Sequence, residues 1–528
     1  MKRILATAIV LGAVATAFAQ QPPEKKEAKV PDDQLPHTKL PPAKLIPNLC
    51  VVKYRVSTSS PECQAFFDQG LAFFYSYVWA EAARSFETAT KYDPDCAMAW
   101  WGLGRACDKW GQAPYAPPLK KAQELTAGAS HRESLLIKAK LQEKGMIEGI
   151  APENRRKEAV KTLDELIALY DDDEEAWFAR AQVADGPNAS VPFYKGLLRI
   201  NPQHPGAHHE LLHHYENIRR PALGWTHALG YMQSSPGIPH AFHMQAHLAM
   251  RIGKWDKTTD NSSHAIELEE AYHKLMNING NDGRVDWQFS HHLETLMRSL
   301  LHDGRYKEAR GIKAKCESLK FDQKVLWFRL HLGERDWEQA EKVAGGFAKD
   351  KLTASYLRAL LYLRKGDVER ATPEVTVLQE AFPSKRNDRT LELRLLEVQG
   401  MLACCRGEEG GLKLLAKAVN KTKDDYNHHA WGQGAYFMEN WGVGALRVNR
   451  LNIAEEAFLE ALAHDAGSAR GALGLQVICE RQNRGEEALR FAELAQKCWR
   501  RADPGLLQAE LQYLREGPAN TATPGNGK

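Results

Sequence analysis

Small, large and proline residues recur along this chain with a period of about 34 residues, and this period constrains the fold more than any other feature. The unit that starts at Cys63 has small residues at three places, phenylalanine between two of them and proline near its end: Gly70, Ala82, Phe86, Ala89 and Pro94. Small residues let two helices cross closely, the large residue fills the space beside them, and proline ends the second helix. The pattern predicts helix–turn–helix units, each stacked on the next.

The same pattern returns along most of the chain. Clear units begin at Ala97, Leu352, Ala435 and Ala469, and weaker ones near Asp171, Pro205, Pro239, Ser290, Phe321 and Leu393. This gives about a dozen units between Cys63 and Glu516, and no strand-like alternation competes with them. The spacing resembles the tetratricopeptide repeat (TPR). The resemblance implies an all-α fold, a right-handed superhelical solenoid whose concave groove binds peptides or partner proteins.

The first residues have the composition of a secretory signal peptide. Lys2 and Arg3 precede an apolar run over residues 4–17, and Ala17-Phe18-Ala19 fits the small-x-small cleavage rule. We therefore predict cleavage after Ala19 and a periplasmic or secreted mature protein. No other apolar run approaches ~20 residues, so we expect no membrane insertion after cleavage.

Composition divides the rest of the chain into segments. We expect a signal peptide at 1–19, a Pro-rich disordered linker at 20–47, N-terminal TPR-like repeats at 48–170, His-rich central repeats at 171–310 with an insertion at 275–287, C-terminal repeats at 311–516 and a disordered tail at 517–528. Loss of Lys2 and Arg3 lowers the net charge from +3 to about +1. Because no basic stripe is present, nothing favours nucleic acid as a partner.

The nine cysteines include no C-x-x-C pair, which argues against a thioredoxin-type centre or a zinc ribbon. Cys50 and Cys63 flank a short loop-like segment and form the best candidate disulfide of an exported chain. The other seven are expected to be small buried apolar residues.

Histidines are concentrated in the central repeats: fourteen of the twenty lie between His204 and His302. Pro202 and Pro236 set the repeat register, and His243 and His247 then follow His209 and His213 by one period. Residues three or four apart share one helical face. The residues that this register places on the groove are Glu175, His209, His213, His240, His243, His247, Arg251, His291, Glu294 and Arg298.

Such a ladder of histidines has the composition of a metal site. Two histidines at i and i+4 chelate a divalent ion well, and neighbouring helices lie close enough to share one. We expect His209, His213, His243 and His247 to be the core ligands, with His240, His291 and Glu294 as further ligands or supporting residues. Because imidazoles dominate, zinc or another transition metal is favoured over calcium.

Residues 209–213 also read H-E-x-x-H, the zinc metalloprotease signature, with Glu210 in the general-base position. The longer metzincin form would need glycine and histidine where Glu216 and Arg219 stand, and Met244 replaces the glutamate in the second histidine pair. The sequence has no phosphate-binding loop, dinucleotide fingerprint or nucleophile elbow. An enzymatic function is therefore possible only through a metal in the histidine groove.

Two functions remain open from the sequence. The first is an exported scaffold that binds a protein or peptide partner through a metal-free groove, in which histidines donate, accept, stack or titrate. The second is a transition-metal site in that groove, used for binding or for hydrolysis. The aromatic residues Tyr75, Tyr77 and Trp79 close the first unit's turn, and we expect them to be core or capping residues.

Overall fold

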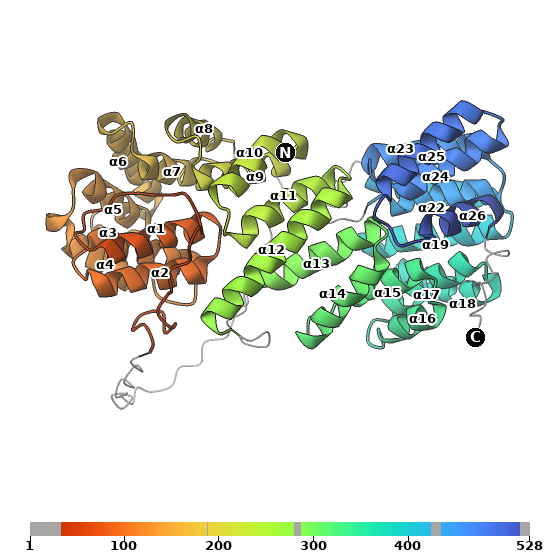
Figure 1. The fold of residues 1–528 in the computed structure, drawn as a ribbon, viewed down its shortest axis with the longest axis horizontal. Coiled ribbons are helices and arrows are strands. Elements are labelled where there is room, and N and C mark those ends of the chain that lie inside the picture. Colours follow the sequence, from red (N-terminus) through yellow and green to blue (C-terminus); the bar gives the residue numbers. More distant parts are fainter. Residues whose placement is uncertain (1–32, 187, 279–286, 424–433, 518–528) are drawn as a thin grey trace.

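The computed structural model describes residues 33–517, except residue 187 and the segments 279–286 and 424–433. Within those residues the chain forms helices and no strand. Consecutive helices pair and stack on the next pair, so the all-α superhelical repeat fold is confirmed. Figure 1 shows two lobes joined by helices that cross the middle of the molecule.

The N-terminal lobe contains the first eleven helices. These are α1 (Pro61–Tyr75), α2 (Trp79–Tyr92), α3 (Ala97–Trp110), α4 (Ala116–Glu124), α5 (His131–Glu143), α6 (Arg155–Leu169), α7 (Glu174–Gln182), α8 (Val191–Ile200), α9 (Pro205–Asn217), α10 (Trp225–Ser234) and α11 (Pro239–Arg251). One continuous hydrophobic core runs through them.

Three helices connect the lobes, and eleven described helices follow. The connecting helices are α12 (Trp255–Met276), α13 (Trp287–His302) and α14 (Tyr306–Ser318). The C-terminal lobe contains α15 (Lys324–Glu334), α16 (Trp337–Gly345), α17 (Lys351–Lys365), α18 (Val368–Ala381), α19 (Arg389–Cys405), α20 (Gly410–Thr422), α22 (Tyr436–Arg447), α23 (Leu451–His464), α24 (Ala469–Arg481), α25 (Gly485–Cys498) and α26 (Leu506–Glu516). Short 3-10 helices lie at Thr126–Gly128, Pro152–Asn154, Pro221–Gly224 and Phe382–Lys385.

The alternation of small and large residues produces the helix crossings that the sequence predicted. A Cβ atom on Gly70 or Gly102 would lie 2.6 or 2.5 Å from the ring of Phe86. Phe86 on α2 therefore fills the space left by glycines on α1 and α3. In the C-terminal lobe, a Cβ atom on Gly442 or Gly474 would likewise lie 2.5 or 2.4 Å from the ring of Phe458.

The proline-rich segment differs from its prediction. Residues 33–47 have no regular secondary structure, yet they pack against α2 instead of forming a disordered linker. The backbone N–H groups of His37 and Thr38 donate to the Glu87 carboxylate at 2.6 and 2.8 Å, and Leu35 is fully buried. The acceptors are buried side chains of α2, which the composition of the segment does not reveal. The remainder of the predicted linker, residues 20–32, lies outside the described residues.

The predicted insertion lies where α12 ends and α13 begins. The predicted insertion at 275–287 begins inside α12, which ends with Asn277 in the left-handed region (φ 52°), and Trp287 already belongs to α13. Residues 279–286 between them, and 518–528 of the predicted tail, lie outside the described residues.

The predicted Cys50–Cys63 disulfide is not formed. Cys50 lies 3.5 Å from the Ser235 hydroxyl, whereas Cys63 contacts Cys96 at the start of α3. The two cysteines are separated because the segment after Cys50 runs toward α10 before α1 begins, as shown by the hydrogen bond from Val51 N to Ser234 O (2.8 Å).

The lobes meet where the start of α12 contacts the turn before α24. Trp255 donates its indole N–H to both oxygens of the buried Asp465 carboxylate, at 2.9 and 3.0 Å. Trp499 donates to the backbone oxygen of His302 at 2.8 Å, and Arg501 pairs with Asp303 at 2.9 Å. These contacts join residues about 200 positions apart and fix the C-terminal lobe to the central helices.

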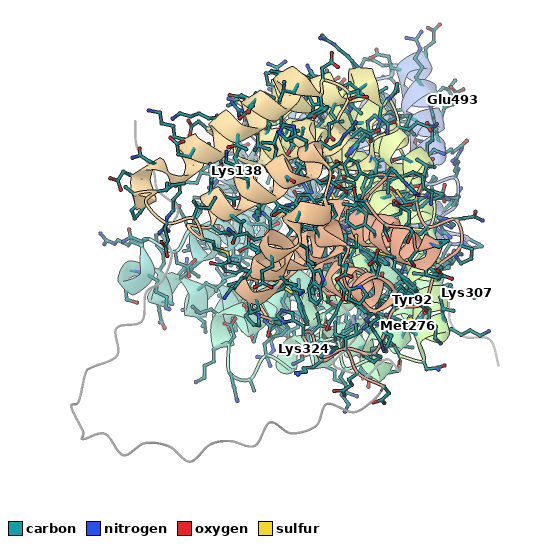
Figure 2. All side chains as sticks on the ribbon, turned by 90° about the vertical axis from the view of Figure 1, so that its left-hand side faces the viewer. Tyr92, Lys138, Met276, Lys307, Lys324 and Glu493 are labelled. Atoms are coloured by element: carbon teal, nitrogen blue, oxygen red, sulfur yellow. The ribbon has the colours of Figure 1, made fainter. Side chains whose placement is uncertain are left out.

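Charged side chains cover the outer surface. Figure 2 shows Lys138, Lys307 and Glu493 projecting outward from α5, α14 and α25. No helix in the described part of the chain is long and apolar enough to cross a membrane.

Candidate metal centre

The histidines that cluster in the central repeats come from three helices, α9, α11 and α13. Pro205 and Pro239 occupy the first turns of α9 and α11, where proline's missing N–H is not needed and its fixed φ favours a helix start. The His204 side chain caps α9 by accepting a hydrogen bond from Ala207 N at 3.1 Å. Each helix then presents histidines on one face, and α13 adds His291.

Three of these histidines meet at one point, which we call cluster A: His209, His213 and His240. The Nε2 atom of His209 lies 3.0 Å from that of His213 and 3.1 Å from that of His240. His209 and His213 come from one turn of α9, whereas His240 comes from the start of α11. The three nitrogens therefore converge from two adjacent repeats.

Three more histidines form cluster B: His243, His247 and His291. The Nε2 atoms of His247 and His291 are 3.2 Å apart. The His243 ring centroid lies 4.3 Å from that of His247 and 4.7 Å from that of His291. In each cluster, one nitrogen from every histidine lies within 4.8 Å of the others. The four predicted core ligands are thus divided between two trios, because one turn of α11 separates His240 from His243 and His247.

The second nitrogen of the ring fixes the protonation of several of these histidines. His209 Nδ1 lies 2.6 Å from the backbone oxygen of Tyr75, and His213 Nδ1 lies 3.3 Å from the Glu216 carboxylate. Both oxygens accept hydrogen bonds, so each Nδ1 carries a proton, and Nε2 of His209, whose ring burial keeps neutral, presents a lone pair. This nitrogen lies 3.0 Å from Nε2 of His213 and 3.1 Å from Nε2 of His240, a convergence that a bound cation stabilises.

In cluster B, carboxylates lie beside the Nδ1 atoms of two of the histidines. His247 Nδ1 lies 3.7 Å from Glu216, and His291 Nδ1 lies 3.7 Å from Glu294. Arg251 pairs with Glu216 at 3.0 Å, and Arg298 pairs with Glu294 at 2.7 Å. Glu216 therefore contacts both clusters, and the predicted groove residues Glu294, Arg251 and Arg298 form an outer ring rather than a wall.

Burial keeps four of the six clustered imidazoles neutral. Desolvation holds the pKa of His209, His240 and His243 well below the ordinary histidine value and lowers the pKa of His247 to about 4. The pKa of Glu216 is lowered although burial opposes this, because His213, His247 and Arg251 favour the carboxylate. Neutral imidazoles and ionised carboxylates are the forms that metal coordination requires.

Two of the three predicted acidic residues lie apart from the clusters. Glu210 accepts hydrogen bonds from the Tyr77 hydroxyl at 2.9 Å and from Gln182 at 3.1 Å. Glu175 is fully buried, pairs with Arg105 at 2.5 Å, and has its pKa raised to about 8 by burial. Glu175 is therefore a core residue of the N-terminal lobe, and Glu210 reaches cluster A only through Tyr77.

Three residues near the clusters were not identified as site residues from the sequence. Tyr77, with φ 61°, stacks its ring on His213 with centroids 5.6 Å apart and planes at 6°. His292 is 1% exposed, and its ring centroid lies 4.4 Å from that of His243. Glu216 follows His213 by one helical turn, a spacing that could have indicated it. Nothing in the sequence near Tyr77 links it to α9.

Most histidines of the two clusters are buried. His209, His243 and His247 are 0%, 2% and 6% exposed, whereas the side chains of His213 and His291 are 30% and 22% exposed. The turn after α1 covers part of α9, with Tyr75 bonded to His209 and Tyr77 stacked on His213. One histidine of each cluster therefore reaches the surface, and the His-lined groove stays a prediction.

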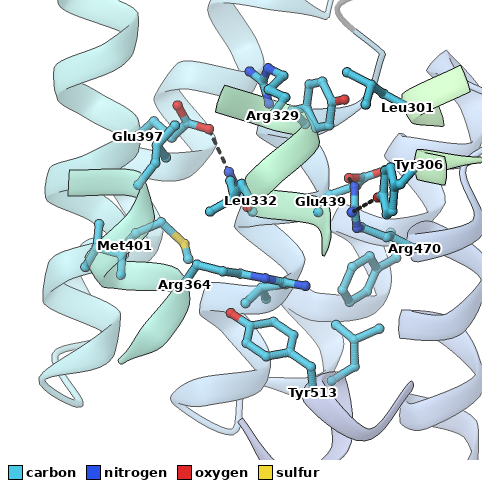
Figure 3. Close-up of a pocket in the computed structure, with 18 residues that line it drawn as sticks. Leu301, Tyr306, Arg329, Leu332, Arg364, Glu397, Met401, Glu439, Arg470 and Tyr513 are labelled. Carbon is cyan, nitrogen blue, oxygen red and sulfur yellow. Dashed lines mark hydrogen bonds and ion pairs between the residues drawn. The ribbon is translucent and has the colours of Figure 1, made fainter. Parts of the chain in front are cut away.

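The inner surface of the C-terminal lobe is filled in another way. A cavity of about 90 Å³ lies there. Figure 3 shows that arginine, glutamate and tyrosine side chains line it together with leucines and a methionine. Arg364 stacks on Tyr513 at 3.6 Å, Arg329 on Tyr436 at 3.9 Å, and Arg470 lies 3.7 Å from Glu439. These pairs leave room for a few water molecules.

The fold and site define a helical-repeat solenoid with buried histidine clusters, and sequence comparison identifies the repeat. Residues 67–112, from α1 to just beyond α3, match the family model of the tetratricopeptide repeat. This match supports the resemblance to the tetratricopeptide repeat that the sequence predicted. TPR solenoids serve as scaffolds for protein–protein interaction, and this fold supports that general role.

Solved structures with similar helical arrangements include yeast Tom70 (13% identity, 86% of this chain and 95% of that chain, TM-score 0.34), the APC/C heterotetramer Cut9–Hcn1 (12%, 86% and 76%, TM-score 0.28) and the human IFIT1 dimer with m7Gppp-AAAA (14%, 83% and 90%, TM-score 0.27). With TM-scores below 0.5, none of them carries an argument about this chain. Comparison with curated proteins finds no significant match.

Proposed function

We propose that this TPR scaffold binds two transition-metal ions, one in each histidine cluster. The observation that carries the proposal is the 3.0 Å contact between the Nε2 atoms of His209 and His213, whose protons are held on Nδ1 by oxygen acceptors. The Nε2 atom of His240 also lies 3.1 Å from that of His209, so three imidazole nitrogens converge as metal ligands would. A metal ion bound between these nitrogens would be coordinated by them.

The spacing of the nitrogens supports a tetrahedral ion. Zinc–nitrogen bonds of about 2.0–2.1 Å place two nitrogens about 3.4 Å apart in a tetrahedron, close to the separations within both clusters. Ligand sets made only of imidazoles favour zinc, copper, nickel or iron over calcium and magnesium. Three protein ligands would leave a coordination position for water or another ligand, which is typical of catalytic rather than structural zinc.

The geometry favours metal binding over proteolysis by an H-E-x-x-H mechanism. A metal there would supply Lewis acidity and an activated water. Glu210, the expected general base, instead accepts hydrogen bonds from Tyr77 and Gln182. The hydrolytic alternative therefore has no positioned base in this arrangement.

The exported location is part of the same proposal and rests on the signal-like residues 1–19. A protein partner would dock on the surface of the solenoid. Cleavage after Ala19 can be tested by N-terminal sequencing of the protein from the extracytoplasmic fraction of cells that express the full chain.

Cobalt substitution tests the metal site directly. Titration of the metal-free protein with Co²⁺ should produce the intense visible d–d bands of a four-coordinate ion, and zinc should displace them. His209→Ala should remove the bands of cluster A, whereas His264→Ala changes an exposed histidine outside both clusters and should leave the spectrum unchanged. Bands that are absent, or that persist equally in His209→Ala, would contradict the proposal.

A further inference from the structure

A large apolar cavity adjoins cluster A. It has a volume of about 600 Å³ and lies between the end of α1, the start of α2, the second half of α12 and residues 40–49. Its walls are mostly apolar and aromatic: Leu49, Phe73, Trp79, Trp110, Leu268 and Tyr272. A cavity of this size matches the pockets that hold small molecules in proteins.

The charged groups in the wall have partners within the chain. Arg84, which is 2% exposed, lies 3.1 Å from Glu81 in the same helix, while its Nε and Nη1 atoms have no hydrogen-bond partner among the described residues. Glu269 faces two imidazoles, His273 at 3.7 Å and His292 at 3.6 Å. The wall therefore offers apolar contact along most of its length, and its occupant is an apolar molecule or an apolar tail.

One end of the cavity is formed by the metal-site residues. His240 of cluster A lines the cavity, and so does Tyr77, whose ring centroid lies 4.5 Å from that of His209. A molecule that fills the cavity thus has one end beside His240, whose Nε2 lies 3.1 Å from that of His209. Three histidine ligands leave a coordination position on the ion.

The other end opens toward solvent at the edge of α12. Ala271 is exposed and Leu275 is 37% exposed, and both line the cavity. Lys44 donates a hydrogen bond to the Leu275 backbone oxygen at 2.8 Å, so the N-terminal segment is tied across this edge. The cavity therefore connects the protein surface with cluster A.

We propose that this cavity holds the apolar tail of a small molecule whose metal-binding head group reaches the ion in cluster A. The inference rests on the proposed metal site and adds the class of ligand. It explains why a site enclosed by helices has an apolar passage beside it.

Alkyl hydroxamates of increasing chain length, from acetohydroxamate to decanohydroxamate, test this inference in calorimetric titrations of the full, zinc-loaded chain. Each added CH₂ that enters the cavity should strengthen binding by about fourfold. Ala271→Trp narrows the entrance and should weaken the long probes while leaving acetohydroxamate unchanged. Ala314→Trp, at an exposed position of α14 outside the cavity, is the matched control and should bind all probes normally.

The outcomes separate this inference from the metal site itself. Bound zinc with no dependence on chain length would overturn the inference and leave the metal site intact. Equal binding of decanohydroxamate to the His209→Ala variant would also overturn it, because the head group would then not reach cluster A. A chain that takes up no metal contradicts both.

Discussion

Glu216 contacts both histidine clusters and holds the proton of one histidine in each on Nδ1. Its carboxylate lies 3.3 Å from His213 Nδ1 and 3.7 Å from His247 Nδ1. Glu216→Gln replaces this acceptor and should weaken zinc binding by about 10–100-fold, as for other carboxylates behind metal-bound histidines. Competition with a chromophoric chelator measures the change.

Glu210→Gln is the matched control for this substitution, since Glu210 also belongs to α9 but bonds to Tyr77 and Gln182. It should leave zinc affinity within a few-fold of the wild type. Equal losses in the two variants would mean that Glu216 has no special role.

His204 provides a pH test at the residue scale. It is fully buried at the start of α9, and burial lowers its pKa to about 3, against about 6.5 in the unfolded chain. The folded state therefore binds fewer protons than the unfolded state between these values, and stability falls as pH decreases. The loss from pH 7 to pH 5 is about 2 kcal/mol for this group.

His204→Asn keeps a helix-capping side chain and removes the titrating ring. Urea denaturation of the metal-free proteins at both pH values should therefore show a smaller loss of stability for the variant. An identical pH dependence in the two proteins would mean that His204 titrates normally in the folded state.

The sequence predicted much of the site at this scale, because helical spacing alone places His209 and His213 on one face. It did not predict that His240 would join them while His243 joined His291. That division depends on how far α9 and α11 are offset along their axes, and side-chain spacing within one helix does not determine the offset.

At the scale of elements, the contact between α1 and α9 encloses the site. Gly206 lies at the start of α9, where a Cβ atom would be 2.7 Å from the rings of Tyr75 and Phe178. Gly206→Ala should destabilise the protein by about 1–3 kcal/mol, because the rings must move. Chemical denaturation measures the difference.

Gly311→Ala is the control for this prediction, since Gly311 lies within α14 and a Cβ there would meet nothing within 4 Å. Alanine favours the helix by about 0.5–1 kcal/mol over glycine, so this variant should be as stable as the wild type or more so. If both variants behave alike, α1 and α9 do not pack as described.

The helices themselves follow from the sequence, because each repeat carries its own small, large and proline residues. The contact between α1 and α9, in contrast, cannot be predicted from the sequence. The hydrogen bond between Tyr75 and His209 joins residues 134 positions apart, and it results from curvature accumulated over several repeats. Small rotations at each repeat add up, and no local pattern encodes their sum.

At the scale of the whole molecule, the two lobes depend on the contact between Trp255 and Asp465. Burial raises the pKa of Asp465 to about 7, and the indole N–H of Trp255 is its donor. Trp255→Phe should cost about 1–3 kcal/mol, because it leaves a buried carboxyl group without that donor. The lobes should then unfold less cooperatively in calorimetry.

Trp441→Phe provides the comparison, since Trp441 is 8% exposed but its indole nitrogen has no hydrogen-bond partner among the described residues. It should lose less stability and keep a single transition. If Trp255→Phe behaves like Trp441→Phe, the junction does not depend on this hydrogen bond.

The repeat period predicted the solenoid but not the arrangement of its ends. Residues 33–47 pack on α2 because Glu87 and Thr88 accept hydrogen bonds from their backbone. Acceptors that lie so far along the chain cannot be recognised from a proline-rich composition.

The central claim, that each histidine cluster binds one metal ion, is tested most directly by elemental analysis. The protein should be purified without a histidine tag and reconstituted with zinc. The account predicts two ions per chain in the wild type, one each in His213→Ala and His291→Ala, and none in the double variant. A wild type that retains no zinc, copper, nickel or cobalt, or a double variant with unchanged metal content, would contradict it.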